Sequence, residues 1–398
     1  MSVRRITQIR AVQVICILTL AILLSAALLP AQEKLSFRID DEVTRFAFSG
    51  DGRIAYAVRH VFSEKKVQLQ RDDIWIADRD GKKRRILQGE KFVHGTGPFS
   101  YLIRELRWSP DNTKLTVELA TSELINEDGE TREGMMTLLL DDSGADISIA
   151  GNDGLIPGAT NAAWLADGVT VVYLTPAQSE TPPPWSERLS NNDKLFMTNI
   201  VRVTGGVGKS TSRQETVSAV AWNAIKSSGV AIRHNQITPP LPNMPADVLP
   251  PHIYALDLTN EKVRELATLD GYVGGLSISP SGDKAAYWVG KEQLEVRDIA
   301  SPNRVTRVRV VLGILGWAAD EKRVLVKQGA ASKSGSLVWI SLPQLVPAAA
   351  GTTPATQDVA LQSILHDLEF RQFDISPDGK SLAVVEPGRR NLLVYSLP

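Results

Sequence analysis

Short apolar segments separated by polar turns recur along the chain, and seven of the turns share one layout. In each, an apolar segment ends in an aromatic residue or isoleucine, a short turn follows, and a second apolar segment begins. These junctions are residues 48–52, 108–112, 164–168, 222–226, 278–282, 317–321 and 375–379. Successive junctions are 60, 56, 58, 56, 39 and 58 residues apart. Repeats of this size built from short strands indicate the blades of a propeller or the turns of a solenoid.

Each repeat reads as four strands. In the second repeat the expected strands are residues 103–108, 114–119, 135–140 and 146–150, in which apolar residues alternate with polar ones or run continuously. Gly, Pro, Asn and Asp mark the ends of such segments, as turns require. No long segment has the periodicity of an amphipathic helix. The pattern therefore predicts an all-β fold, a single seven-bladed β-propeller of four-stranded antiparallel blades.

The two ends of the repeat array predict how the ring closes. The last repeat contains three expected strands, residues 369–375, 381–386 and 391–397. Residues 34–39 precede the first repeat, alternate polar with apolar positions and have no partner within it. An unpaired strand edge is a liability that closed architectures remove. We therefore expect this N-terminal strand to pair with residues 391–397 and to close the propeller by joining the last blade.

The long connections are expected on one rim of the propeller. Those between the second and third strands of a blade are residues 59–71, 120–134, 175–194 and 234–251, and the main ones between blades are residues 88–101 and 343–367. Loops on a rigid scaffold often carry binding residues. The candidate binding residues on this insertion-rich face are Arg59, His60, His94, Trp185, Arg233 and His234. The alternative interpretation is a set of tolerated surface insertions without a ligand.

The N-terminal segment predicts export. Arg4, Arg5 and Arg10 precede a largely apolar run at residues 11–29, and small residues follow at a suitable place for cleavage. This layout is typical of a secretory signal peptide at residues 1–31, which leaves residues 32–398 as the propeller. An uncleaved anchor in the inner membrane is the alternative, because about 20 apolar residues span a bilayer. We expect a periplasmic or extracellular protein, with membrane attachment through residues 11–29 under the alternative.

Composition narrows the classes of function. Cys16 is the only cysteine and lies in the signal segment, so the exported part has neither a disulfide nor a catalytic thiol. Removing residues 1–31 takes away three of the 44 Lys+Arg residues and none of the 45 Asp+Glu residues, which leaves a net charge of about −4. That charge gives no electrostatic reason to expect a nucleic acid as partner.

One segment resembles a nucleotide-binding loop. Residues 204–211 read Thr-Gly-Gly-Val-Gly-Lys-Ser-Thr. The standard motif needs glycine where Val203 stands, and the variant motif needs lysine where Thr204 stands. Such a loop also opens a helix next to a parallel strand, whereas here it lies between expected strands. We expect a flexible turn and no cofactor.

Other catalytic patterns are weaker still. The five histidines occur singly, without a pair at metal-ligand spacing, so no metal site is expected. No Gly-x-Ser-x-Gly elbow occurs. Four tryptophans occupy the same position in their repeats, and we expect them to pack between blades: Trp108, Trp164, Trp222 and Trp317. For Trp185, in a proline-rich segment, exposure for binding and simple packing are both open.

Four of the junctions resemble the TolB-type, WD40-like β-propeller repeat. They are residues 48–56, 108–111, 278–287 and 375–383, with the motif Ser-Pro-Asp-Gly or a close variant after the apolar strand. The resemblance covers the chain from about residue 34 onward and implies the fold but not an activity. Two features of the family are absent from this sequence: the α/β domain that precedes the propeller in TolB, and the hydrolase domain of related peptidases. Neither translocation partners nor peptidase activity follow from it.

Together these patterns predict an exported, non-catalytic and monomeric propeller that binds a protein, a peptide or a glycan through its insertion-rich face. One alternative is an enzyme, a lyase or hydrolase with its site in the central opening. Another is an accessory subunit of a membrane complex. Carboxylates and histidines clustered at the central opening would favour the enzyme, and an apolar, aromatic loop face would favour the binding protein.

Overall fold

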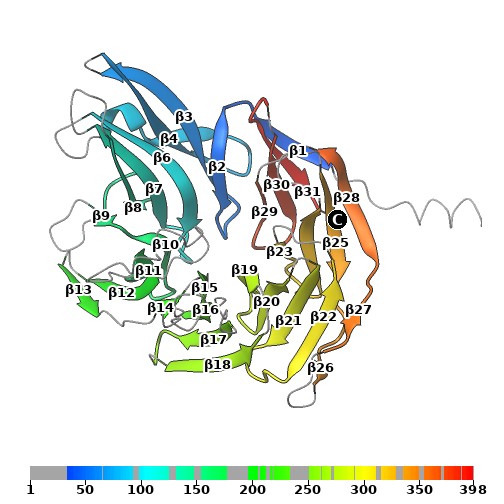
Figure 1. The fold of residues 1–398 in the computed structure, drawn as a ribbon. Coiled ribbons are helices and arrows are strands. Elements are labelled where there is room, and N and C mark those ends of the chain that lie inside the picture. Colours follow the sequence, from blue (N-terminus) through cyan, green and yellow to red (C-terminus); the bar gives the residue numbers. More distant parts are fainter. Residues whose placement is uncertain are drawn as a thin grey trace, which may run out of the picture.

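In the part of the chain that the structure describes, the regular structure consists of strands and one short 3-10 helix, η1 (Gly89–Lys91) (Figure 1). This computed structural model describes residues 34–397 except 65, 93–97, 125–130, 148–153, 177–195, 205–206, 212–215, 218, 234–250, 261, 270–272, 291, 311–314, 329–334, 349–353, 369–371 and 387. Within these ranges no helix is long and apolar enough to cross a membrane. The expected signal segment, residues 1–31, lies outside the described residues.

The first half of the described chain forms three sheets. The largest has eight strands: β2 (Val43–Phe48), β3 (Ile54–Glu64), β4 (Val67–Ala77), β5 (Lys83–Leu87), β6 (Phe99–Trp108), β7 (Lys114–Leu124), β8 (Thr131–Asp141) and β9 (Leu155–Pro157). The next has five: β10 (Thr160–Trp164), β11 (Thr170–Pro176), β12 (Phe196–Thr204), β13 (Val207–Thr211) and β14 (Thr216–Val217). The third has four: β15 (Ala219–Asn223), β16 (Ser228–Arg233), β17 (His252–Asp257) and β18 (Lys262–Thr268).

Three further sheets complete the described molecule. One contains β19 (Val273–Ile278), β20 (Lys284–Val289), β21 (Gln293–Asp298), β22 (Arg304–Arg309), β26 (Val346–Pro347) and β27 (Thr356–Gln357). The second contains β23 (Leu315–Trp317), β24 (Arg323–Gln328), β25 (Gly335–Ser341) and β28 (Leu361–Leu368). The third contains β29 (Phe373–Ile375), β30 (Ser381–Val385), β31 (Leu392–Ser396) and β1 (Lys34–Ile39). The sheets lie side by side around a common centre (Figure 1).

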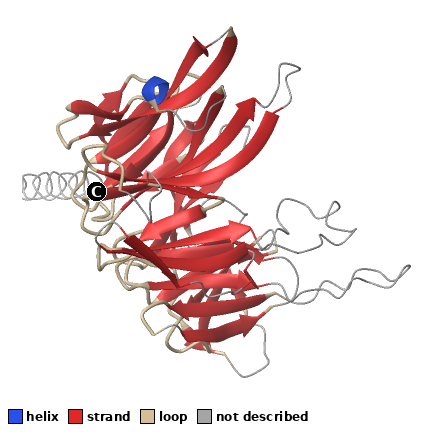
Figure 2. Cartoon of the chain, turned by 90° about the vertical axis from the view of Figure 1, so that its left-hand side faces the viewer, coloured by secondary structure: helices blue, strands red, loops and turns tan. Residues whose placement is uncertain are grey.

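Local sequence explains the tight turns between the first two strands of a repeat. The hydroxyl of Ser109 donates to Asp111 Oδ1 at 2.5 Å and accepts from the backbone amide of Lys114 at 2.9 Å. Asn112 between them has a φ of 60°, which asparagine tolerates better than most residues. The same serine–aspartate pair recurs as Ser49–Asp51 and Ser376–Asp378. Many of the described turns gather along one side of the molecule (Figure 2).

The repeated tryptophans pack between successive repeats, as the sequence predicts: Trp108 of β6 reaches β2 within the eight-stranded sheet, and the others lie between neighbouring sheets. The indole N–H of Trp108 donates to the carbonyl of Ala47, and that of Trp222 donates to the carbonyl of Asn161. Trp317 donates to Ser277 Oγ. Trp164 is 1% exposed and packs in the apolar cluster around Leu139 and Tyr173. Each indole ring buries apolar area, and the N–H groups of Trp108, Trp222 and Trp317 each have an acceptor. Tryptophan stabilises a core in this way.

The first described strand belongs to the same sheet as the last one. β1 pairs antiparallel with β31, with Lys34 opposite Ser396 and Ile39 opposite Leu392. The amide of Val43 then donates to the carbonyl of Arg390 at 2.9 Å. Side chains from both ends of the chain share one apolar cluster: Ile39, Val43, Phe46, Leu392 and Val394. The first and the last described strands therefore hold each other in place.

Two expected elements are corrected by the structure. β8 pairs with β9 (Leu155–Pro157), where the sequence predicts residues 146–150; Asp146 bridges Leu140, and residues 148–150 lie outside the described residues. The expected inter-repeat loop at residues 343–367 contains β28, the outer strand of its own sheet, and the segments β26 and β27, which pair with β22 of the preceding sheet. This insertion therefore lies between the third and fourth strands, at the opposite rim from the one expected. These pairings are non-local, so the sequence pattern does not reveal them.

The glycine-rich segment lies in an antiparallel hairpin. β12 and β13 pair with Arg202 opposite Lys209 and Thr204 opposite Val207. A phosphate-binding loop instead precedes a helix whose first amides face the ligand. Strand residues Val207–Thr211 stand where that helix would begin, so most of the segment expected as a flexible turn is strand; residues 205–206 lie outside the described residues.

Candidate functional site

The connection between β3 and β4 is a strand hairpin, not the loop that the sequence predicts at residues 59–71. The two strands stay in register from Ile54 opposite Ala77 to Glu64 opposite Val67. Lys66 in the turn has a φ of 68°, the left-handed conformation that tight hairpins need. β7 and β8 extend in the same way, to Leu124 opposite Thr131. Candidate residues Arg59 and His60 therefore lie on a strand.

Arg71 on β4 fastens this hairpin to its surroundings. Its side chain is 2% exposed and donates through Nε to the carbonyl of Phe99 at 2.7 Å. Nη1 donates to the carbonyls of Glu90 and Phe92, and the guanidinium lies 4.8 Å from the ring of Phe62. A buried guanidinium with this many acceptors is strongly directional. Arg71 thus fixes the hairpin, η1 and the start of β6 relative to one another.

Asp72 supplies the matching negative charge on the other face of β4. Its carboxylate is fully buried, accepts from Arg59 Nε at 2.6 Å and accepts from the backbone amide of Ile103 at 2.8 Å. The hydroxyl of Tyr101 donates to the Asp72 carbonyl. Burial is the main reason that the pKa of Tyr101 is raised, and the nearby negative charges of Asp72 and Asp73 raise it further. Asp73 accepts from the amide of Gly89 at 2.7 Å. Each buried carboxylate is therefore hydrogen-bonded.

The outer part of the hairpin exposes a mixed apolar and charged strip. His60 stacks on Phe62 with ring centroids 5.6 Å apart, and its Nε2 lies 3.8 Å from Glu90 Oε2. Val61, on the opposite face of β3, is 47% exposed. We call residues Arg59, His60, Val61, Phe62 and Glu90, which together span both faces of the outer hairpin, the hairpin surface. Aromatic, aliphatic and charged groups on a rigid strand are suited to contacting another polypeptide.

The structure brings together only part of the candidate binding set. Arg59 and His60 are neighbours on β3, whereas Arg233 closes β16 in another sheet, opposite His252. His94, Trp185 and His234 lie outside the described residues. Sequence reasoning missed the residues that build the hairpin surface from below, Arg71, Asp72 and Asp73. The available signal was three consecutive charged residues directly before an apolar strand, which indicates buried ion pairs.

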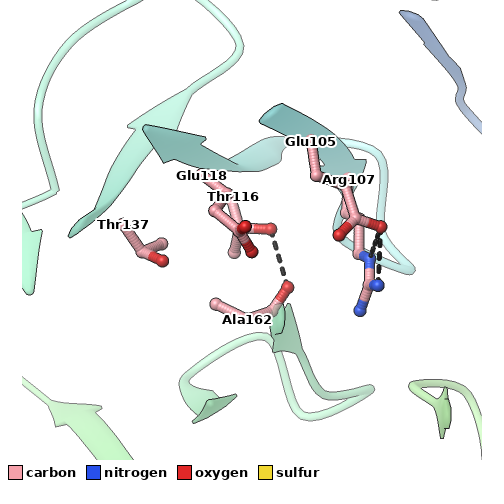
Figure 3. Close-up of a pocket in the computed structure, with 6 residues that line it drawn as sticks. All are labelled: Glu105, Arg107, Thr116, Glu118, Thr137 and Ala162. Atoms are coloured by element: carbon pink, nitrogen blue, oxygen red, sulfur yellow. Dashed lines mark hydrogen bonds and ion pairs between the residues drawn. The ribbon is translucent and has the colours of Figure 1, made fainter. Parts of the chain in front are cut away.

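The inner strands of the eight-stranded sheet carry a second polar cluster (Figure 3). Glu105 on β6 stands directly opposite Glu118 on β7 and forms an ion pair with Arg107 at 2.6 Å. Thr116 donates to the carbonyl of Ala162 on the neighbouring sheet at 2.9 Å. The space that these residues line with Thr137 has no room for a water molecule. The cluster thus joins two sheets and offers no space for a substrate in this arrangement.

Two carboxyl groups near the centre are hard to ionise. Burial raises the pKa of Glu118, and the charge of Glu105 adds to the effect. Burial also raises the pKa of Asp374 on β29 to about 6, again with a contribution from Glu105. Raised pKa values occur at catalytic sites and at structural contacts alike. Among the described residues no group of three His, Cys, Asp or Glu side chains is placed to hold a metal ion.

Comparisons with known proteins identify the fold. No family model matches the sequence, and no curated protein matches it. A chain in the crystal structure of the mitotic checkpoint complex is 14% identical, with a TM-score of 0.53 over 92% of this chain and 91% of that one. The β-propeller domain of Myceliophteria thermophila Cps50 (Swd1) is 11% identical, with a TM-score of 0.53 over 92% of this chain and all of that one. The chain has a β-propeller fold. At this identity the likeness extends to the fold alone.

Proposed function

We propose that this chain is an exported, non-catalytic β-propeller of the TolB type that binds a protein or peptide through the hairpin surface. The observation that carries the proposal is the burial of Arg71 beneath that surface, because its bonds to Phe99, Glu90 and Phe92 hold the hairpin in one conformation. A rigid surface loses little conformational entropy on binding. His60, Val61 and Phe62 then meet the partner without rearrangement.

We further propose seven blades in a closed ring. The eight-stranded sheet is held together between β4 and β6 by a single parallel pair, Arg71 opposite Tyr101, so it divides naturally into two four-stranded blades. β1 completes the last blade. Gln372 Nε2 donates to the carbonyl of Phe46 at 3.1 Å, from the last blade to the first. These contacts support closure by hydrogen bonds and shared apolar packing.

Export is the remaining part of the proposal. It is supported by the arginines and the apolar run that precede residue 31 and by the position of the single cysteine within that run. A periplasmic or extracellular location follows for the propeller. N-terminal sequencing of the protein from cells tests it: a mature chain that begins between residues 28 and 33 supports cleavage, and an intact N-terminus on membrane-bound protein supports the anchor.

Site-specific photocrosslinking tests the binding surface. A photoreactive phenylalanine analogue at position 61 should give an adduct of discrete mass in cells, because Val61 is 47% exposed on the outer part of the hairpin, on the face opposite His60 and Phe62. The same group at Val346, which is 50% exposed at a different rim, is the matched control. His60→Ala should reduce the adduct at position 61. Equal adducts at both positions, or none at position 61, would refute the proposal, and an adduct that resists proteases would indicate a glycan instead.

A further inference from the structure

A cleft of about 960 Å³ lies between the β15–β18 sheet and the β19–β22 sheet, far from the hairpin surface in the chain. Its lining comes from the turns at the ends of the strands, with Lys226 on one side and Ser281–Asp283 on the other. Three small residues of the β15–β18 sheet, Ser228, Gly229 and Ala255, leave the space open. The volume falls within the range of about 300–1,000 Å³ that small-molecule sites occupy.

Contacts at both ends of the cleft hold its two walls at a fixed separation. At the inner end, Asn223 Nδ2 donates to the carbonyls of Ser279 and Pro280, each at 3.0 Å. At the outer end, Arg264 Nη2 donates to the carbonyl of Ile299, so one residue of β18 reaches across to the neighbouring sheet. The cleft is therefore a built feature between two bonded sheets, and binding would need no opening of the blades.

The charges around the cleft favour a negative ligand. Lys226, Lys262 and Arg264 bring three positive charges to its walls. Within the part of the chain that the structure describes, neither lysine lies within ion-pair distance of a carboxylate. Arg264 uses Nη2 for the carbonyl of Ile299 and keeps further N–H groups that can donate to an anion.

The two aspartates that line the cleft offset its positive charge only in part. Lys262 stands opposite Asp257, whose pKa is lowered chiefly by hydrogen bonds from Asn260 and further by the charge of Lys262. Asp257 Oδ1 accepts from the backbone amides of Thr259 and Asn260, and its Oδ2 accepts from the Asn260 side chain. Both oxygens of this carboxylate therefore point into its own turn. Asp283 is exposed at the rim on the opposite wall. Three cations against two carboxylates leave the lining of the cleft with a net positive charge.

We propose that this cleft binds a small organic anion, with its phosphate or carboxylate group held by Lys262, Arg264 and Lys226 and the rest of the molecule against Ala255 and Ile299. Lysine and arginine together suit such groups, because the ammonium supplies a point charge and the guanidinium supplies directed N–H donors. The proposal is independent of the hairpin surface and of the partner that binds there.

Isothermal titration with two probes, pyrophosphate and citrate, tests the site and distinguishes its two chemistries. The purified protein at low ionic strength should bind at least one probe saturably, with one site and a Kd below about 1 mM. Lys262→Glu combined with Arg264→Glu should weaken binding about fivefold or more. An exposed contact between opposite charges contributes up to about this factor to affinity, and the two new carboxylates would also repel the anion. Lys226→Glu, from the other end of the lining, should weaken it in the same direction.

Lys82→Glu is the matched control, because Lys82 is an exposed lysine in the turn between β4 and β5, the equivalent turn of another blade. Its Kd should equal that of the wild type. Binding of pyrophosphate alone assigns a phosphate ligand, and binding of citrate alone assigns a carboxylate ligand. The absence of saturable binding by both probes would overturn the proposal. An equal loss of affinity in Lys82→Glu would also overturn it, because it would mean that the anion is attracted to the positive charge of the whole surface and not to this cleft.

Discussion

The carboxylate of Glu118 accepts a 2.6 Å hydrogen bond from the backbone amide of Asn161, which belongs to the next sheet. Asn161 also reaches the sheet beyond, because its Nδ2 donates to the carbonyl of Val220 and its own carbonyl accepts from Trp222. It adopts a φ of 51°, in the left-handed region. Asn161 thus joins its own sheet to the sheets on both sides.

The double role of Asn161 gives a first prediction. Asn161→Ala should lower the free energy of unfolding by about 2–3 kcal/mol, because the carbonyl of Val220 loses its donor and alanine is strained at positive φ. Asn161→Gly removes the same donor without the strain, so it should cost about 1 kcal/mol less. Urea unfolding of the two variants measures the difference. A glycine variant less stable than the alanine variant would contradict this explanation.

Asp374 gives a prediction about pH. Its pKa rises from 3.8 to about 6 in the folded protein, so below about pH 4 it is protonated in both states and at higher pH its ionisation opposes folding. The stability that the neutral form of Asp374 contributes is complete below pH 4 and is lost as the pH rises through 6. Asp374→Asn should therefore stabilise the protein by about 1–2 kcal/mol at pH 7.5 and have little effect at pH 4. Unfolding curves across that range test it.

Asp378 is the matched control for that experiment. Hydrogen bonds from Ser376 and Lys380 lower its pKa despite partial burial, so its ionised form supports the fold above its unfolded pKa. Asp378→Asn should destabilise the protein at pH 7.5, and the difference should fade as the pH drops below 4. Opposite signs for the two variants at pH 7.5 are the expected result. The same sign for both would mean that charge state is not the cause.

Arg71 gives a prediction for the hairpin. Arg71→Met should lower the free energy of unfolding by about 3 kcal/mol or more, since the buried carbonyl of Phe99, the part-buried carbonyls of Glu90 and Phe92 and the carboxylate of Glu64 lose their donor. Amide hydrogen exchange in residues 59–71 should speed up. Arg71→Lys keeps the charge with fewer directed donors and should have a smaller effect. Unchanged exchange in both variants would show that the hairpin does not depend on this residue.

The pairing of β1 with β31 gives a prediction about the ends of the chain. A protein that starts at residue 41 loses the ladder from Lys34 to Ile39 and the buried side chain of Ile39, which is 2% exposed. It should be less stable by several kcal/mol than one that starts at residue 34. Differential scanning calorimetry of the two proteins compares them. Equal melting temperatures would mean that the last blade is held without β1.

Local features of the fold were predictable from the sequence, and pairings between distant segments were not. Ser109 and Asp111 specify their turn through bonds to residues within five positions, so the junction motif alone reveals it. The strand at Leu361–Leu368 pairs with β25 across a long insertion, which no local pattern encodes. At the hairpin, polar residues 59–71 resemble a loop, yet Arg71 and Asp72 are buried because β6 and η1 supply their partners. The sequence could single out Arg59 and His60 by their position after an apolar strand, but it could not reveal the buried residues that hold them in place.

The segments β26 and β27 have a consequence for how the molecule unfolds. They come from the connection between β25 and β28, yet they cover the outer edge of β22, with Val346 opposite Val305 and Gln357 opposite Val308. An uncovered edge strand can recruit another chain and begin aggregation. Opening the β23–β28 sheet would pull this cover away from its neighbour. We therefore expect the β19–β22 sheet and the β23–β28 sheet, the fourth and fifth in chain order, to exchange their amide hydrogens as one cooperative unit.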